Sequence, residues 1–259
     1  MRLIDTHCHL AHGRLRQRTA DVLDRARQAG VVGVVCAVGN LCAARAALTL
    51  SREHAGVWVT AGVHPHDAKD AGDAYLAELE RLASDERNVA VGEIGLDFHY
   101  DYSPRDVQRR VFAEQLDLAR RLGKPVVVHT REAFDDTMAI LRESGADAAR
   151  VVFHSCTEEE PDLRRAVEFG AMVSFSGIVT FRRTGYLRKA AVGVPDDRLL
   201  VETDAPFLSP EPVRKHKTNE PANVVHVAAC MASVRDTSLD ALAKLTTANA
   251  ARFFGFSAP

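Results

Sequence analysis

Short apolar runs alternate with longer amphipathic stretches along the whole chain. Eight runs rich in β-branched and aliphatic residues have the near-continuous hydrophobicity of parallel strands that helices cover. These runs are 3–4, 31–37, 57–61, 89–91, 126–128, 151–153, 172–175 and 199–201. The stretches between them carry apolar residues at helical spacing and predict helices over 19–29, 43–53, 73–84, 104–122, 133–143, 158–169, 184–191 and about 222–254.

Capping residues support these boundaries. Ser103 and Pro104 stand where a capping residue and a proline at the first helical position would begin a helix. Gly30, Gly123 and Gly170 stand where helices should end. The predicted elements are therefore consistent with the residues that flank them.

Eight strand-then-helix units predict a single (β/α)8 TIM barrel. The chain has 259 residues, close to the roughly 250 typical of this fold. A doubly wound open sheet is the alternative architecture for the same alternation. No linker rich in Pro, Gly or Ser interrupts the pattern, so we expect one domain over residues 1–259.

Composition is that of an ordinary globular protein, with one exception. Hydrophobic residues make up 46% and charged residues 26%, which argues against disorder and coiled coil. The formal net charge of −2 provides no overall field toward nucleic acid, so such a partner would need local basic patches. Eleven histidines are more than ordinary usage predicts, and they favour metal chemistry if they converge.

The cysteines and the apolar runs suggest a compartment. Five dispersed cysteines without a CxxC pair argue against a disulfide framework and for a reducing environment. The first residues show no secretory signal, and no apolar run reaches the ~18 residues that span a bilayer. We expect a cytoplasmic protein without membrane contact, and a monomer.

Histidines and acids gather where the predicted strands end. In a TIM barrel the chemistry takes place at this carboxyl-terminal rim. The first strand runs into His7 and His9, the third into His64 and His66, and the fifth and sixth into His129 and His154. Acidic residues follow the fourth strand, Glu93 and Asp97, and the eighth, Glu202 and Asp204.

The pair His7 and His9 offers two metal ligands on one face of a strand. Residues two apart point to the same side, so Cys8 between them points away. Alone, this motif is a weak signal and favours a hydrogen-bonded pair in a polar barrel mouth. Convergence with His129, His154 and two carboxylates exceeds the needs of one structural zinc and fits two divalent ions.

These motifs give the chain its resemblance to a known family. The segments IDTHCHL at 4–10, GVHPHDA at 62–68, VGEIGLDF at 91–98, VSFSGIVTF at 173–181, LLVETDAPFLSPEP at 199–212 and NEPANV at 219–224 carry it. The chain resembles the TatD-type metal-dependent deoxyribonucleases, which belong to the amidohydrolase-like barrels. The combination of GEIGLDF and ETDAP is specific, and the matching segments extend from end to end.

The resemblance implies a ligand set and an activity. It implies that two divalent ions are held by six side chains, with Glu93 as the bridging carboxylate. They are His7, His9, Glu93, His129, His154 and Asp204. It also implies 3′-to-5′ exonuclease activity on DNA.

Three segments depart from the family pattern. Ala11 follows the first motif where an aspartate is usual, and His154 is followed by Ser-Cys-Thr in place of Cys-Phe-Ser-Gly. The loop from Arg214 to Thr218 is one residue longer than the family's Arg-Gly-Lys segment and lacks its glycine. None of the departures affects a ligand, so we expect them to bear on substrate preference.

A mechanism follows from the residue types. Two divalent ions can polarise a phosphoryl oxygen and acidify a shared water. Asp204 is our candidate to ligate one ion and to take or orient the proton of the water, with pure ligation as the alternative; Glu93 is its catalytic partner. Glu202 we expect to orient a histidine, or to form a buried ion pair. Imidazoles mixed with carboxylates leave Zn, Mg and Mn open.

Several further residues are candidates for binding the substrate. His64 is assigned to phosphate or nucleophile contact, or to loop structure, and we expect His66 to be an ordinary loop residue. Arg131 could grip a phosphate or form an ion pair at the rim. Basic residues follow the seventh and eighth strands (Arg182, Arg183, Arg188, Lys189, Arg214, Lys215, Lys217), where barrels often bind phosphate, although such runs are often solvated surface. Phe98, Tyr100 and Tyr102 offer rings for base stacking or for packing beneath their loop.

Three functions therefore compete. The first is a deoxyribonuclease acting on single-stranded or frayed DNA ends. The second keeps the metals but hydrolyses an ester or amide, as in a D-aminoacyl-tRNA deacylase. The third is a non-enzymatic barrel that binds metal or nucleic acid.

Overall fold

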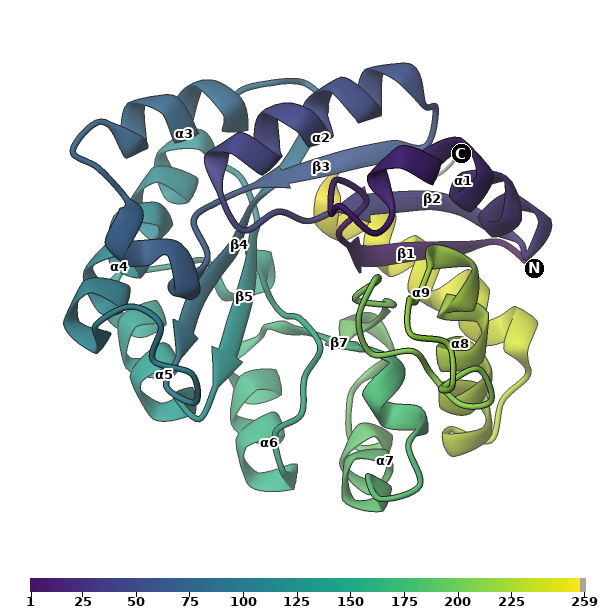
Figure 1. The fold of residues 1–259 in the computed structure, drawn as a ribbon. Helices are drawn as coiled ribbons and strands as arrows, with labels where there is room; N and C mark the ends of the chain where they lie inside the picture. Colours follow the sequence, from purple (N-terminus) through teal and green to yellow (C-terminus); the bar gives the residue numbers. More distant parts are fainter. Residues whose placement is uncertain (257–259) are drawn as a thin grey trace.

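Eight parallel strands form a nearly closed barrel, which confirms the predicted fold class over the open sheet (Figure 1). The computed structural model describes residues 1–256. The strands follow one another in chain order: β1 (Leu3–Cys8), β2 (Val31–Cys36), β3 (Val57–Ala61), β4 (Asn88–Asp97), β5 (Val126–Arg131), β6 (Val151–Phe153), β7 (Met172–Phe175) and β8 (Leu199–Val201). Beyond the end of β8, Ala205 bridges to Cys8 and the amide of Asp204 donates to the carbonyl of His7 over 2.9 Å, so β1 and β8 complete the circle.

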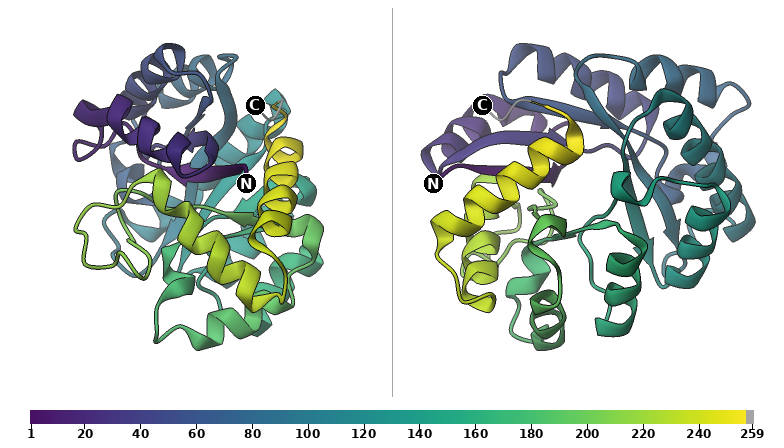
Figure 2. Two further views of the ribbon diagram at one scale, coloured as in Figure 1. Left: turned by 90° about the vertical axis from the view of Figure 1, so that its right-hand side faces the viewer. Right: turned by 180° about the vertical axis from the view of Figure 1, so that it is seen from behind.

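Helices surround the strands on the outside (Figure 2). They are α1 (Thr19–Gln28), α2 (Leu41–Glu53), α3 (Tyr75–Ala83), α4 (Arg105–Leu122), α5 (Phe134–Glu143), α6 (Glu160–Phe169), α7 (Gly185–Val192), α8 (Val224–Val234) and α9 (Leu239–Phe254). The last predicted helical region is thus two helices, and Ser238 caps the second by accepting from the amide of Ala241. None of the helices in residues 1–256 is long and apolar enough to cross a membrane.

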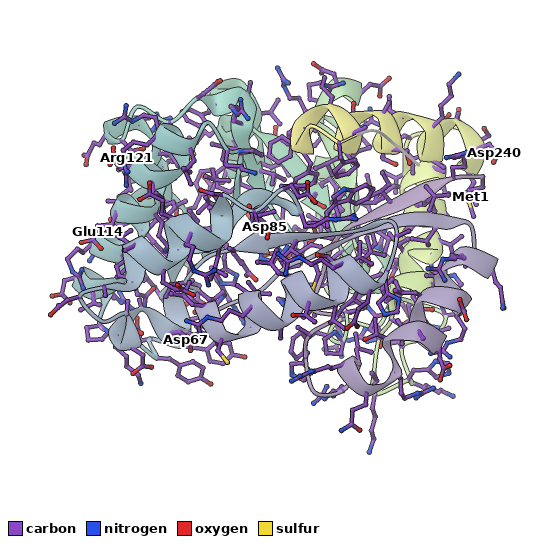
Figure 3. The ribbon with its side chains drawn as sticks, turned by 90° about the horizontal axis from the view of Figure 1, so that it is seen from above. Met1, Asp67, Asp85, Glu114, Arg121 and Asp240 are labelled. Carbon is purple, nitrogen blue, oxygen red and sulfur yellow. The ribbon has the colours of Figure 1, made fainter. Side chains whose placement is uncertain are left out.

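The apolar side chains form two layers. A large cluster fills the space between the strands and the helices. A smaller cluster occupies the barrel interior and takes residues from seven of the strands: Ile4, Val35, Val89, Ala90, Val127, Val152, Met172 and Leu200. Phe253 and Phe254 of α9 close this cluster at the amino-terminal end of the barrel. α9 is also tied to the chain start, where the amino group of Met1 lies 3.3 Å from Asp240 (Figure 3).

Several predicted boundaries differ from the structure for physical reasons. β1 and β4 are longer than their apolar runs, because their polar residues continue the ladder into the barrel mouth. Ser103 does not cap α4, which begins after Pro104. Its hydroxyl instead donates to the carbonyl of His66 and accepts from the amide of Lys69, and this fixes the loop after β3.

Gly95 permits a close approach of β4 and β5 at the rim. Its φ of +140° lies in a region that favours glycine, and a Cβ there would lie 1.9 Å from the carbonyl oxygen of His129. No other residue fits without moving β5. The glycine therefore sets the spacing between the strands that carry Glu93 and His129.

Candidate active site

The polar residues of the site lie two residues beyond the apolar layer of the barrel interior, toward the carboxyl ends of the strands. Val127 and His129 are two residues apart on β5, and the same spacing relates Val152 to His154 and Leu200 to Glu202. Because alternate residues of a strand face the same side, strands with apolar residues inside the barrel also bring polar residues to its mouth. The regular strand geometry thus places these polar side chains together.

Glu93 is the centre of the cluster, with only 4% of its surface exposed. One carboxylate oxygen, Oε1, lies 2.8 Å from His154 Nε2, 3.0 Å from His129 Nδ1 and 3.2 Å from His64 Nε2. The other, Oε2, lies 3.3 Å from His7 Nε2 and 3.9 Å from His9 Nε2. The two oxygens therefore face two separate groups of imidazoles.

Asp204 lies with the first of these groups. Its Oδ1 is 3.1 Å from His9 Nε2 and 3.8 Å from His7 Nε2. Asp204 has a φ of +56°, a left-handed conformation that aspartate tolerates better than most residues. The carboxyl group of Asp5 stabilises this turn by accepting hydrogen bonds from the amide (2.9 Å) and the hydroxyl (2.6 Å) of Thr203.

A second set of acceptors orients the imidazoles. His154 Nδ1 lies 3.2 Å from the buried carboxylate of Glu202, a contact that both roles expected of Glu202, orienting a histidine and forming a buried ion pair, would produce. His129 Nε2 lies 3.0 Å from Asp97, and the Nδ1 of His9 lies 3.1 Å from the carbonyl of Ala37. With these outer nitrogens donating, the inner nitrogens of His9, His129 and His154 face Glu93 and Asp204. Protonated, they donate to these carboxylates, and a bound cation would take the place of those protons.

His64 has the opposite tautomer. Its Nδ1 accepts from the amide of His66 over 3.1 Å, so its Nε2 carries the proton and donates to Glu93. Burial lowers the pKa of His64 to about 4, so the ring is neutral near pH 7. His64 therefore lies within the cluster and presents a hydrogen-bond donor to Glu93.

The sequence predicted no site role for His66 and none for Asp97, although it placed Asp97 at the rim. His66 was expected to be an ordinary loop residue, but its Nε2 lies 2.9 Å from the Asp97 oxygen that also accepts from His129. A signal was present, because Asp97 follows Glu93 at the end of the same strand. The shared contact itself depends on β4 continuing to Asp97, which its apolar run does not predict.

The charges of the cluster depend on burial and on neighbouring groups. Burial alone would raise the pKa of Glu93, but His154, His64 and His129 hold it well below its usual range. Burial likewise opposes ionisation of Asp204, and His9 lowers its pKa. Burial lowers the pKa of His154, yet Glu93 and Glu202 raise it well above that of free histidine. Both central carboxylates are thus ionised at neutral pH.

The donor set fits divalent metal ions. Both ring nitrogens of His7 are buried and lack a hydrogen-bond partner among the described residues, a costly arrangement that a coordinated cation would relieve. Ligand atoms lie within 4.8 Å of one another in three groups, namely His7, His9 and Asp204; His7, His154 and Glu202; and His64, Glu93 and His129. Imidazole nitrogens and carboxylate oxygens in such groups can hold Zn, Mn or related ions.

The structure changes the interpretation of the nearby arginines. The guanidinium of Arg131 lies 4.8 Å from the ring centroid of Tyr100, in place of the ion pair expected as the alternative. Arg188 donates to the carbonyls of Val179 and Phe181, so it stabilises the loop after β7. Arg214 stacks on Phe181 at 3.7 Å.

Lys217 and Phe98, two further candidates for substrate binding, differ in their exposure. Lys217 is exposed in the loop after β8, and Phe98 is buried beneath its loop, with the guanidinium of Arg105 4.5 Å from its ring. Phe98 therefore packs under the loop and leaves Tyr100 and Tyr102 as the accessible rings.

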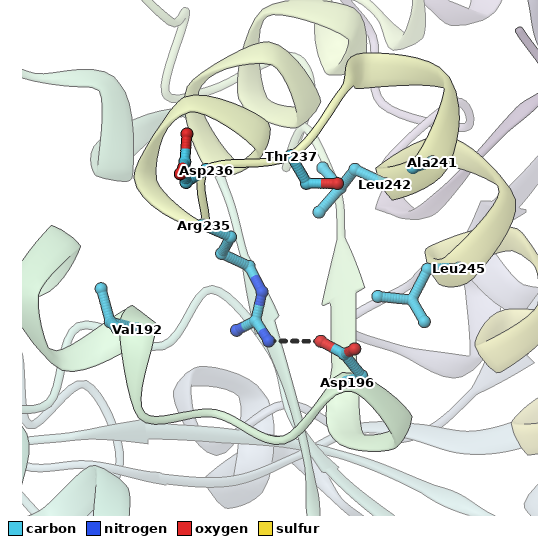
Figure 4. Close-up of a pocket in the computed structure, with 8 residues that line it drawn as sticks. All are labelled: Val192, Asp196, Arg235, Asp236, Thr237, Ala241, Leu242 and Leu245. Atoms are coloured by element: carbon cyan, nitrogen blue, oxygen red, sulfur yellow. Dashed lines mark hydrogen bonds and ion pairs between the residues drawn. The ribbon is translucent and has the colours of Figure 1, made fainter.

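A separate cavity lies away from the Glu93 cluster (Figure 4). Its volume is about 480 Å³, and it lies between the start of β8 and helices α7, α8 and α9. Arg235 in its wall pairs with Asp196 and with two backbone carbonyls, so its charge is already satisfied. The cavity contains no imidazole and no unpaired acidic cluster, and it is not the reactive centre.

Comparison with known proteins identifies the family. The model of the TatD-related DNases matches residues 4–255. The chain belongs to this family. Among its relatives, the uncharacterized metal-dependent hydrolase YcfH of Escherichia coli is 41% identical over 261 residues, which cover 100% of this chain and 97% of YcfH. The 3′-5′ ssDNA/RNA exonuclease TatD of Klebsiella pneumoniae is 34% identical, with 98% of each chain covered.

A solved structure agrees with the TatD assignment. The crystal structure of YjjV, a TatD homologue from Escherichia coli, superimposes with a TM-score of 0.93 at 27% identity and covers 98% of both chains. This TatD-family chain is thus a metal-dependent hydrolase built on the barrel of its relatives.

Proposed function

We propose that this TatD-family protein is a divalent-metal-dependent deoxyribonuclease that removes nucleotides from the 3′ ends of single-stranded or frayed DNA. The observation that carries the proposal is the arrangement around Glu93. Its two oxygens face separate groups of imidazoles, as expected of a carboxylate that bridges two cations.

The six predicted ligands take distinct positions in this proposal. His7, His9 and Asp204 surround Oε2 of Glu93, and His129 and His154 lie at Oε1. Bound there, two divalent ions would supply an acidified water and would stabilise negative charge on a phosphoryl group. Whether these are Zn, Mn or Mg depends on affinities that the donor types leave open.

The protein side chains orient and exchange protons. Asp204 is ionised and partly accessible, so its carboxylate can accept a hydrogen bond from the attacking water and take its proton. The neutral His64 offers an N–H at the same centre, where it can donate to a phosphate oxygen. Glu202 and Asp97 accept hydrogen bonds from the outer nitrogens of His154 and His129, which leaves the inner nitrogens as the ones that would ligate a cation.

Two features support a nucleic-acid substrate. Relatives such as that of Klebsiella pneumoniae are named 3′-5′ ssDNA/RNA exonucleases. Arg214 and Lys217 are exposed in the loop after β8, where they can attract phosphates despite the nearly neutral net charge. The monomeric state and the cytoplasmic compartment stay predictions.

A substrate panel tests the proposal. Purified protein is stripped with a chelator, reloaded with Mn²⁺, Mg²⁺ or Zn²⁺, and given single-stranded oligonucleotides blocked at the 3′ or the 5′ end. We expect stepwise shortening of the 5′-blocked strand and protection of the 3′-blocked strand. A D-aminoacyl-tRNA ester is included as the competing substrate, and hydrolysis of the ester without hydrolysis of DNA would favour the deacylase over the nuclease.

A further inference from the structure

Large exposed apolar side chains gather at the mouth of the barrel. Six such residues occur in the described chain, and three of them, Met1 at the chain start and Tyr186 and Val192 on α7, lie outside the loops after β4 and β8. Tyr100 and Tyr102 belong to the loop after β4, and Phe207 to the loop after β8. Rings of this size normally pack inside a protein, so their exposure beside a catalytic centre indicates a binding role.

Tyr100 and Tyr102 form an aromatic shelf. Their ring centroids are 5.1 Å apart with planes inclined by only 13°, so the two rings are already stacked. Arg131 lies over Tyr100 and has no acidic partner among the described residues. Tyr102 is the more open ring, with 55% of its surface exposed. The shelf therefore offers an aromatic face with a positive charge beside it.

The shelf adjoins one side of the Glu93 cluster. The centroid of the Tyr102 ring is 4.8 Å from that of His66, and His66 shares Asp97 with His129. His129 in turn lies at Oε1 of Glu93. A short chain of contacts thus connects the shelf to this oxygen.

Phe207 adjoins the other side. It lies 5.9 Å from His9 and 5.4 Å from His12, measured between ring centroids, and His9 Nε2 lies 3.9 Å from Oε2 of Glu93. The guanidinium of Arg14 lies 5.9 Å from the Phe207 ring and, like Arg131, has no acidic partner among the described residues. An exposed ring with an adjacent arginine therefore stands on each side of the carboxylate.

The geometry points to two base-stacking positions, one on Tyr102 and one on Phe207, that hold successive bases of a single strand on either side of the phosphate to be cut. This inference rests on the proposed nuclease function and adds how the strand is held. Every nucleobase has a flat face, so stacking of this kind is tolerant of sequence. Arg131 and Arg14 would pair with the flanking phosphates or stack on the bases.

The test compares strands with and without bases. Binding is measured by fluorescence anisotropy with a phosphorothioate-linked thymidine decamer, which resists cleavage, and with the same backbone carrying abasic residues. The variants Tyr102→Leu and Phe207→Leu keep apolar bulk but remove the ring. Tyr186→Leu is the matched control, because Tyr186 is exposed to a similar degree, belongs to α7 and not to either of these loops, and donates through its hydroxyl to the carbonyl of Thr157.

We expect Tyr102→Leu and Phe207→Leu each to weaken binding of the thymidine strand by about five- to a hundredfold and to leave the abasic strand unchanged. Tyr186→Leu should bind both strands as the wild type does. Equal losses for both strands, or no loss for either, would overturn the stacking positions. Hydrolysis of an unmodified strand is recorded separately, so a protein that stacks bases without cutting them refutes the nuclease proposal and not this one.

Discussion

The two halves of the barrel interior are built from the same strands but serve different ends. Toward the amino-terminal end, aliphatic residues such as Val127 and Leu200 pack beneath Phe253 and Phe254. Two residues further along the same strands, His129 and Glu202 enter a cluster of buried charges. Burying apolar groups stabilises a fold, whereas burying imidazoles and carboxylates costs free energy unless they are paired. The comparison indicates that the apolar half of the interior, at the amino-terminal end of the strands, stabilises the fold, and that the polar half, at the carboxyl-terminal end, carries the reactive groups. We call these the lower half and the upper half.

The largest expected effect is the loss of hydrolysis on substituting Glu93, the centre of the upper half. Glu93→Gln removes the negative charge that both groups of imidazoles face and should lower metal-dependent hydrolysis by about a thousandfold or more. Because the fold depends mainly on the lower half, circular dichroism should be unchanged. Glu143→Gln, on the exposed surface of α5, is the control and should keep full activity. A Glu93→Gln protein with near-normal turnover contradicts this role.

The lower half should show the reverse pattern. Leu200→Ala leaves a cavity beneath the site and should lower the free energy of unfolding by about 2–5 kcal/mol, measured by urea denaturation. Turnover per folded molecule should change little. Leu245→Ala, a half-buried position on α9, should cost less. If Leu200→Ala abolishes activity without changing stability, the division between the halves is wrong.

The acceptors behind the imidazoles should have intermediate effects. Glu202→Gln keeps the size of the side chain but replaces the charged acceptor of His154 Nδ1 with a neutral amide, so metal affinity should fall by about ten- to a hundredfold. Isothermal titration with Mn²⁺ or Zn²⁺ measures the affinity directly. Unchanged affinity together with lost stability would mark Glu202 as a purely structural ion-pair partner.

The smallest effect should be the contribution of Glu158, in the loop after β6, to the pH dependence of stability. Burial and the nearby Asp162 raise the pKa of Glu158 to about 7 from 4.5, so the folded state binds its proton more tightly than the unfolded chain does. The stabilisation is complete below pH 4.5 and is lost as the pH rises to about 7. Relative to Glu158→Gln, the wild type should lose less than about 1 kcal/mol over this range, because Glu158 is half-exposed. Urea denaturation at a series of pH values would show parallel curves if Glu158 does not titrate this way.

The sequence predicted the barrel and the group of side chains at its mouth, because both follow from periodicity. Apolar runs identify strands, and side chains at the strand ends must share one rim. The tautomers of His64 and His129 could not be predicted, since they depend on partners from distant segments. The same holds for Asp97 and His66, which meet only because β4 extends beyond its apolar run, and for Arg131, whose contact with Tyr100 depends on the folded loop.

The central claim is that the upper half is a two-cation hydrolytic centre bridged by Glu93. Chelator-stripped protein is titrated with Mn²⁺ or Zn²⁺ while nucleotide release from a single-stranded oligonucleotide is followed, and bound metal is counted at each step. The account predicts no release from the stripped protein and full activity at two bound ions per chain. Release from the metal-free protein, or no release at any metal content, would contradict it.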